Sequence, residues 1–170
     1  MKALESRLEQ LSEADERARL LMTHPGIGVI NALALVHTLG EVRRFRREEE
    51  VIAFVGLDPL EKSSGWTKRI GQISKHGSRL ARQLLGQAAQ VFRDHRIRKF
   101  YLEVSRRSGR PKAKVAAARK LLINCYVMLR DGLGYEEFQR PAEVGLCGVR
   151  RGESESLGLL GLMARPAISR

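Results

Sequence analysis

The spacing of apolar side chains along the first part of the chain predicts two helices joined by a tight turn. Over residues 2–23, apolar residues recur every three or four positions with charges of both signs between them, which is typical of an amphipathic helix. Pro25 ends this helix because it lacks a backbone N–H and restricts the residue before it. Residues 29–39 are almost entirely apolar, so we expect a buried helix that Gly40 closes.

The first of these helices has two interpretations. Its leucines form a seam that Asp15 interrupts. In one interpretation the helix packs on its own domain. In the other it is the end of a coiled coil whose earlier turns precede Met1, since three heptads alone make a marginal coiled coil.

The middle of the chain predicts a long ordered loop between helices. A short helix over 47–55 ends at Gly56. Residues 56–75 show no clear periodicity, and we read them as an ordered loop, with a small hairpin over 66–73 as an option. Loops of this length inside a compact domain are usually functional.

Beyond this loop the helical periodicity returns over three segments, which are 77–94, 97–107 and 112–131. It fades after residue 140. We therefore predict an all-α protein with a coiled-coil-like helix over 1–23, a helical domain over 24–140 and a poorly ordered tail over 141–170.

The charge balance indicates a polyanionic partner. The chain carries 31 Lys and Arg against 19 Asp and Glu, a formal net charge of +12. Its longest apolar run is far too short to span a bilayer. Two cysteines and four scattered histidines give neither a disulfide framework nor a metal spacing. These features favour a cytoplasmic, nucleic-acid-binding protein without a metal of its own.

The turn Pro25-Gly26-Ile27-Gly28 is the first candidate site. A helix–glycine turn–helix presents backbone N–H groups at the start of the second helix, where they bind phosphate without reading bases. Side chains at Gly26 and Gly28 would block the approaching oxygens. This pattern is like a helix-hairpin-helix DNA-binding motif, and the alternative is an ordinary glycine connection between helices.

The serines of the long loop are the second candidate. Ser63-Ser64-Gly65 lies near Lys68, Arg69 and Lys75. A serine hydroxyl is a weak nucleophile unless a base, a metal or positive charge assists it, and cations would also neutralise a phosphate under attack. The alternative is a serine–glycine pair of no chemical role, which is common in loops.

An ordered set of residues makes the picture specific. The set is Pro25-Gly26-Ile27-Gly28, Ala32, Leu35, Gly40, Phe45, Ala53, Gly56-Leu57-Asp58-Pro59, Ser64-Gly65, Gly71, Ile73-Ser74-Lys75, Gly77, Arg82 and Ala88-Ala89. Over residues 4–135 the chain resembles the C-terminal half of insertion-sequence transposases of the "one-ten" family. Trp66 and Ala81 depart from the family pattern.

The resemblance implies a DNA recombinase guided by a structured RNA. Full-length members join an N-terminal RuvC-like domain, whose four carboxylates bind magnesium, to a C-terminal all-α domain with an essential serine. Ser64 matches that serine and would join covalently to DNA. The nucleic-acid contacts would come from Gly26, Gly28, Lys68, Arg69, Lys75, Arg79 and Arg82.

The carboxylate domain has no counterpart in this sequence. The expected partners are therefore DNA, a guide RNA, and either a second copy of this chain or a RuvC-like half that carries the magnesium. A non-catalytic helix-hairpin-helix module is the second hypothesis. A protein that dimerises through residues 2–23 is the third.

Overall fold

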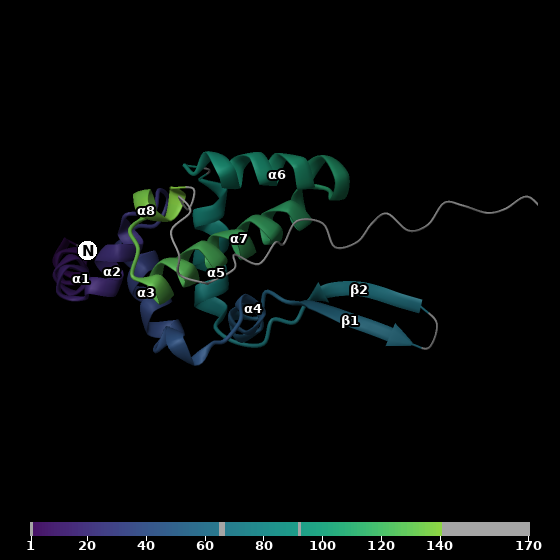
Figure 1. Ribbon diagram of the computed structural model, residues 1–170, viewed down its shortest axis with the longest axis horizontal. Helices are drawn as coiled ribbons and strands as arrows, with labels where there is room; N and C mark the ends of the chain where they lie inside the picture. The colour runs from purple at the N-terminus through teal and green to yellow at the C-terminus, as the bar shows by residue number, and fades with distance from the viewer. Residues whose placement is uncertain (1, 65–66, 92, 141–170) are drawn as a thin grey trace, which may run out of the picture. The chain divides into compact units, whose positions relative to one another are not determined.

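Helices form most of the described chain, with one two-stranded hairpin between α4 and α5 (Figure 1). The computed structural model describes residues 2–64, 67–91 and 93–140, and within 61–71 it describes the backbone alone. The elements are α1 Lys2–Ala14, α2 Glu16–Met22, α3 Val29–Leu39, the 3-10 turn η1 Val42–Arg44, α4 Glu48–Val55, β1 Pro59–Ser64, β2 Thr67–Ile73, α5 Arg79–Gln90, α6 His95–Ser108, α7 Arg110–Asp131 and α8 Tyr135–Gln139. The predicted all-α class is confirmed.

The long helix α7 is the centre of the core. It contacts α2, α4, α5, α6 and η1, and its Leu122 and Met128 have no exposed surface. The buried Tyr126 hydroxyl donates to the Phe45 carbonyl oxygen at 2.9 Å, so this polar group is satisfied inside the core. Burial raises the pKa of the neighbouring Cys125 thiol to about 12, so the thiol stays protonated at neutral pH.

Helix α3 is buried as its sequence predicts. Leu35, Val36 and Leu39 are each 1% exposed or less. Gly40 follows the helix with φ +60°, a left-handed backbone angle that glycine adopts without strain. An all-round apolar helix needs neighbours on several sides, and α1, α2 and α5 supply them.

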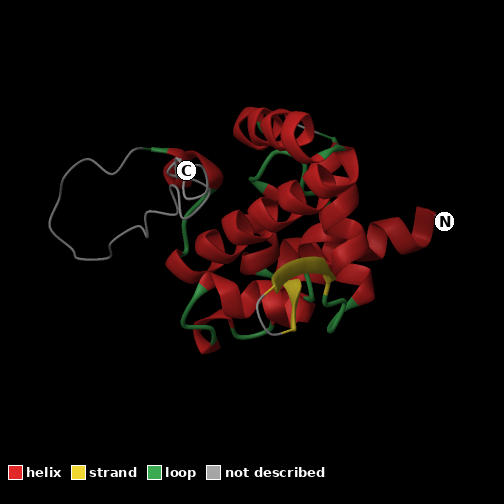
Figure 2. Cartoon of the chain, turned by 90° about the vertical axis from the view of Figure 1, so that its right-hand side faces the viewer, coloured by secondary structure: helices red, strands yellow, loops and turns green. Residues whose placement is uncertain are grey.

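The amphipathic segment over 2–23 is two helices. Asp15 has an extended backbone, and its carboxylate accepts from the Arg17 N–H at 2.9 Å, so it caps α2. Helix α2 buries Leu21, whereas α1 leaves Leu4 70% and Leu11 45% exposed. The N-terminal end of α1 projects from the body in Figure 2. The coiled coil stays a prediction.

The long loop is mostly a β-hairpin, which differs from our expectation. β1 and β2 pair antiparallel from Pro59 with Ile73 to Ser64 with Thr67. The predicted hairpin over 66–73 covered only the second strand. The strands are largely polar, so no apolar alternation marked them in the sequence.

Two smaller differences concern the end of the described chain. α7 begins at Arg110, two residues before the predicted start. Pro111 therefore lies in its first turn, where a backbone N–H has no partner within the helix and its absence costs no hydrogen bond. The short α8 was not predicted. Residues 1–140 form one compact unit, and the predicted tail over 141–170 lies outside the described residues. No helix in the described part is long and apolar enough to cross a membrane.

Candidate nucleic-acid interface

The two chain segments at the foot of the hairpin are bonded to each other. Lys75 N–H donates to the Gly56 carbonyl oxygen at 3.2 Å, and Ser74 N–H donates to the Asp58 carbonyl oxygen at 2.9 Å. The Ser74 hydroxyl also donates to the Asp58 carboxylate. Residues 55–58 are thereby tied to 74–78, and we call these two segments the loop clamp.

Two glycines let the segments of the loop clamp come this close. Gly77 has φ +101°, and a Cβ at this position would lie 2.0 Å from the Phe54 carbonyl oxygen. Gly56 has φ +77°, and its Cβ would lie 2.7 Å from both the N and the O of His76. Both positions therefore combine a left-handed backbone with a backbone neighbour that leaves no room for a side chain.

Arg82 holds the loop clamp to α5. Its Nη1 atom donates to the Val55 carbonyl oxygen at 2.9 Å and to the Gly77 carbonyl oxygen at 3.0 Å. The Ser78 hydroxyl accepts from Ala81 N–H at 3.2 Å and caps the same helix. Arg82, which we predicted to bind phosphate, thus uses one of its nitrogen atoms to stabilise the loop clamp.

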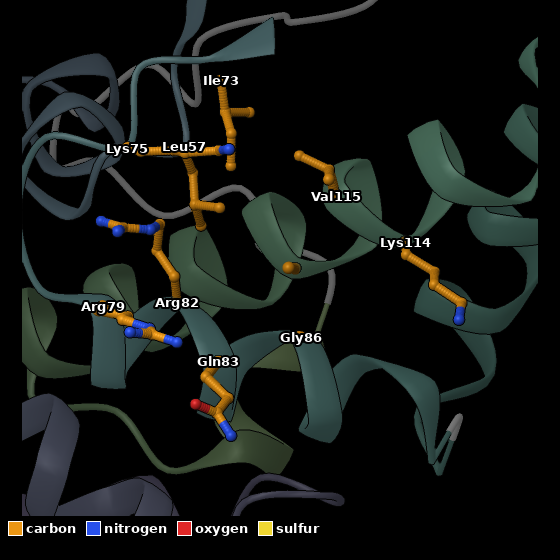
Figure 3. A pocket seen from close by; sticks show the side chains of 10 residues that line it. Leu57, Ile73, Lys75, Arg79, Arg82, Gln83, Gly86, Lys114 and Val115 are labelled. Carbon is orange, nitrogen blue, oxygen red and sulfur yellow. The ribbon is translucent and has the colours of Figure 1, made fainter.

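A pocket of about 430 Å³ opens beside the loop clamp. It lies between the hairpin foot, α5 and α7, and its lining residues are Leu57, Ile73, Lys75, Arg79, Arg82, Gln83, Gly86, Lys114, Val115 and Ala118 (Figure 3). The predicted Lys75, Arg79 and Arg82 therefore meet at one place. Lys114, far along the chain, joins them.

Ser64, Lys68 and Arg69 lie on the hairpin away from its foot. Ser64 ends β1, and the register sets Ser63 opposite Lys68 and Lys62 opposite Arg69. β1 spans about 17 Å from Pro59 to Ser64 at ~3.3 Å per residue. The side chains of these residues lie outside the described part of the structure, so their roles stay predictions.

The glycine turn lies at the other end of α5. A Cβ on Gly26 would be 3.6 Å from the Ala88 carbonyl oxygen, and Gly28 is the exposed N-cap of α3. About 15 Å of α5 separates Ala88 from Ser78 beside the loop clamp. The pocket extends along α5 as far as Gly86, but neither Gly26 nor Gly28 is among its lining residues.

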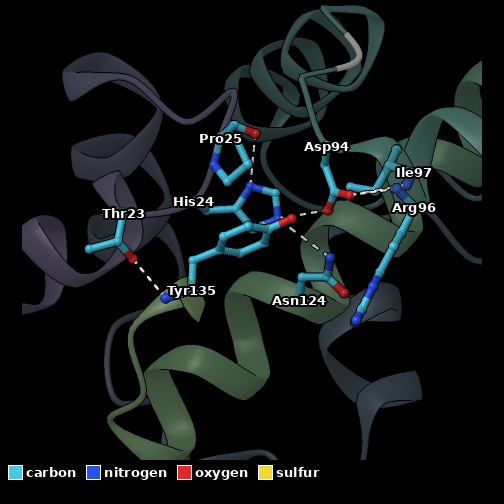
Figure 4. Close-up of polar contacts among 8 residues, drawn as sticks. All are labelled: Thr23, His24, Pro25, Asp94, Arg96, Ile97, Asn124 and Tyr135. Carbon is cyan, nitrogen blue, oxygen red and sulfur yellow. Dashed lines mark hydrogen bonds and ion pairs between the residues drawn. The ribbon is translucent and has the colours of Figure 1, made fainter. Parts of the chain in front are cut away.

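His24, a buried histidine beside this turn, was not predicted from the sequence as part of a site. The His24 side chain is fully buried, with Nδ1 3.0 Å from the Pro25 carbonyl oxygen and Nε2 3.4 Å from Nδ2 of Asn124 (Figure 4). In the neutral ring a proton on Nδ1 serves the first contact, and Nε2 accepts from Asn124. Asp94 lies 3.5 Å from Nε2. No spacing rule links positions 24, 94 and 124.

Tyr135 closes the same cluster. Its ring meets His24 edge-on with centroids 4.5 Å apart. Burial, together with a hydrogen bond to Asp94, raises the pKa of Tyr135 to about 12. Asp94 also accepts from the N–H of Arg96 at 2.7 Å and caps α6. The cluster therefore fixes the glycine turn against α6, α7 and α8.

The buried His24 predicts acid sensitivity. Burial lowers the pKa of His24, an effect that the Pro25 carbonyl and Asp94 only partly offset. The unfolded chain, with an ordinary histidine pKa near ~6.5, then binds the proton more readily, so the free energy of unfolding falls as pH drops below about 6.5. We expect a slope of up to ~1.4 kcal/mol per pH unit from this residue.

Urea unfolding from pH 7.5 to 5.5 measures this slope. His24→Gln should flatten it, whereas replacement of the exposed His37 by glutamine should leave it unchanged. Equal slopes in the wild type and His24→Gln would contradict the assignment.

The comparisons with known proteins concern the same residues. The family model described as "Transposase IS116/IS110/IS902 family" matches residues 18–102, a segment that runs from α2 into α6 and contains the loop clamp. The chain is 32% identical over 91 residues to the "Transposase for insertion sequence element IS1111A" of Coxiella burnetii. The aligned segment covers 54% of this chain and 25% of that protein.

Two further relatives give the same result. A "Probable family 20 transposase" of Pseudomonas aeruginosa is 36% identical over 88 residues, 52% of this chain and 26% of its own length. The "Insertion element IS110 uncharacterized 43.6 kDa protein" of Streptomyces coelicolor is 30% identical over 148 residues, 85% of this chain and 36% of its own. The chain thus spans about a quarter to a third of these relatives. With half of its residues matched by the family model, it belongs to the IS116/IS110/IS902 transposase family.

Proposed function

We propose that this chain is the part of an insertion-sequence transposase that grips the DNA backbone and presents Ser64 to it. The observation that carries the proposal is the loop clamp. It anchors the hairpin, whose first strand ends at Ser64, beside a pocket lined by Lys75, Arg79 and Lys114. A DNA strand that follows the hairpin for about 17 Å would link the pocket to Ser64.

The charge at the pocket supports a phosphate ligand. Lys75, Arg79 and Lys114 are exposed, and none of them forms an ion pair with a carboxylate whose side chain the structure describes. Exposed cations gathered around one pocket attract phosphodiesters and release counterions on binding. Aromatic residues are only 5% of the chain, so contact with the backbone fits better than stacking on a platform of rings.

The proposed chemistry is attack of the Ser64 Oγ atom on a DNA phosphorus. The Oγ–P bond forms as the bond from phosphorus to one deoxyribose oxygen breaks, the serine loses its proton, and the leaving oxygen gains one. In the described part of the chain, no three acidic, histidine or cysteine side chains are grouped to hold a metal. Under this proposal, magnesium would be held by the carboxylates of the RuvC-like half that the family resemblance implies.

A non-catalytic nucleic-acid-binding module is the second candidate. The observation that favours it is the group of exposed cations Lys75, Arg79 and Lys114 at the pocket, which would account for DNA binding without any chemistry at Ser64. Both candidates predict DNA binding, and only the first predicts a covalent adduct with the complementing half present. Under either candidate function, the glycine turn would contact nucleic acid and a guide RNA would be a further partner.

The test of the shared claim is a salt titration of DNA binding. We expect fluorescence anisotropy with a labelled duplex to show a steep fall of affinity with salt. Lys75→Ala and Arg79→Ala should each weaken binding about five- to tenfold and reduce the log–log slope by about 1. Arg82→Ala is a poorer probe because it also removes two bonds of the loop clamp.

Arg19→Ala is the matched control, because Arg19 is an exposed cation on α2 that does not line the pocket. It should change the affinity less than twofold. A salt-insensitive affinity, or an equal loss in Arg19→Ala, would refute the proposed interface.

A further inference from the structure

The pocket beside the loop clamp has two chemically different parts. Leu57, Ile73, Val115 and Ala118 give it apolar walls, and Leu57 and Ala118 are nearly fully buried. The exposed cations among its lining residues are Lys75, Arg79 and Lys114. A phosphate alone needs only the cations. The apolar walls therefore indicate a ligand that also has an uncharged, flat or greasy part.

Gly86 is one of the residues that line this pocket. It lies inside α5, and a Cβ built on it meets no atom within 4 Å. Its backbone is helical, so the fold does not need glycine at this position, and glycine is among the poorest helix formers. The absent side chain leaves open space at Gly86, which lines the pocket together with Gln83 of the same helix (Figure 3).

We propose that the pocket receives one unpaired nucleotide of the DNA, with its base against the apolar walls and its flanking phosphates at Lys75 and Arg79. This inference rests on the proposed function. A nucleotide combines an apolar flat base with two adjacent anions, which matches the two parts of the pocket. A volume of about 430 Å³ lies in the range of ordinary small-ligand sites. A base inside a continuous duplex is stacked and cannot enter.

The experiment compares three labelled duplexes that differ at one position. The first is fully paired, the second has a single-nucleotide bulge, and the third has an abasic bulge that keeps the phosphate and the flexibility but lacks the base. We expect the wild-type chain to bind the bulged duplex about tenfold more tightly than the other two. Equal affinity for the base-containing and abasic bulges would overturn the inference.

Two substitutions at one position provide the matched pair. Gly86→Leu places a branched side chain in the pocket and should reduce the preference for the bulge to less than twofold. Gly86→Ala adds one methyl group in open space and should keep the preference. Both variants should unfold at the wild-type temperature or above it, since both residues favour helix more than glycine does. A preference that survives Gly86→Leu in the folded protein would overturn the inference.

A second measurement uses the wild-type chain alone. With 2-aminopurine as the bulged base, binding should raise its fluorescence severalfold, because the base leaves the stack for a pocket with aliphatic walls. Unchanged fluorescence on a bound duplex would also overturn the inference. Loss of the bulge preference with paired-duplex binding intact refutes only the nucleotide pocket, whereas failure to bind any of the three duplexes refutes the proposed function.

Discussion

Replacement of Ser64 by alanine is expected to abolish the covalent protein–DNA adduct in a reaction complemented with a RuvC-like half. Alanine has no oxygen to bond to phosphorus, and loss of a nucleophile typically lowers the rate by more than about a thousandfold. DNA affinity should change less than twofold, because one uncharged hydroxyl contributes little beside the cations of the interface. A denaturing gel with end-labelled DNA measures the adduct.

Ser63→Ala is the matched control for this experiment. Ser63 precedes Ser64 in the same strand and pairs with Lys68 in the register. Its replacement should leave the adduct at the wild-type level. An adduct that persists in Ser64→Ala, or that disappears equally in both variants, would remove Ser64 from the mechanism and favour the non-catalytic module.

Replacement of Gly77 by alanine is expected to lower the free energy of unfolding by about 3 kcal/mol. The backbone at φ +101° would strain any L-residue by ~1–2 kcal/mol. The new methyl group, 2.0 Å from the Phe54 carbonyl oxygen, also forces the loop clamp apart, and each hydrogen bond lost there costs about 1 kcal/mol. Urea unfolding measures the total, and hydrogen exchange should show faster exchange at Ser74 and Lys75.

Gly86→Ala is the comparison that isolates the backbone effect. It makes the same chemical change at a helical glycine with open space around its Cβ position, and should raise the free energy of unfolding by up to ~1 kcal/mol. The affinity for DNA should fall in Gly77→Ala, because Lys75 belongs to the loop clamp. It should stay at the wild-type level in Gly86→Ala. Equal stability of Gly77→Ala and the wild type would show that the loop clamp is not held as described.

Much of the helical framework could be predicted from local pattern. The apolar run over 29–39 predicts α3 to the residue, and Gly40 and Gly56 mark the ends of α3 and α4. These signals are local, because helix periodicity and capping depend on residues within one or two turns. The capping carboxylate of Asp15 is an equally local signal, and it separates α1 from α2 where the apolar spacing predicts a single helix.

The hairpin could not be predicted in the same way. β1 and β2 are tied by pairing across the chain, and their largely polar residues carry no apolar alternation. The sequence therefore predicts a loop at Ser64, whereas its backbone belongs to β1. The buried cluster around His24 could not be predicted for a related reason. Its other members, Asp94, Asn124 and Tyr135, lie far from His24 in the sequence.

The candidate site also has a part that the sequence predicts and a part that only the structure shows. Lys75, Arg79 and Arg82 were predicted as cations of one segment, and the structure adds that Arg82 bonds to the Val55 and Gly77 carbonyls. Lys114 and Gly86 reach the pocket only through the packing of α5 against α7. The glycine turn contacts α5 at Ala88 but contributes no lining residue to that pocket, which only the tertiary structure shows.

The sequence by itself determined the helical class, the positive charge and the family, because composition, periodicity and an ordered set of short motifs are properties of the chain in one dimension. Only the tertiary structure decided which cations share a surface, which glycines lack room for a side chain, and which polar groups are buried together. Those properties depend on distances between residues far apart in the chain, and side-chain packing of α5 and α7 with the loop clamp sets them.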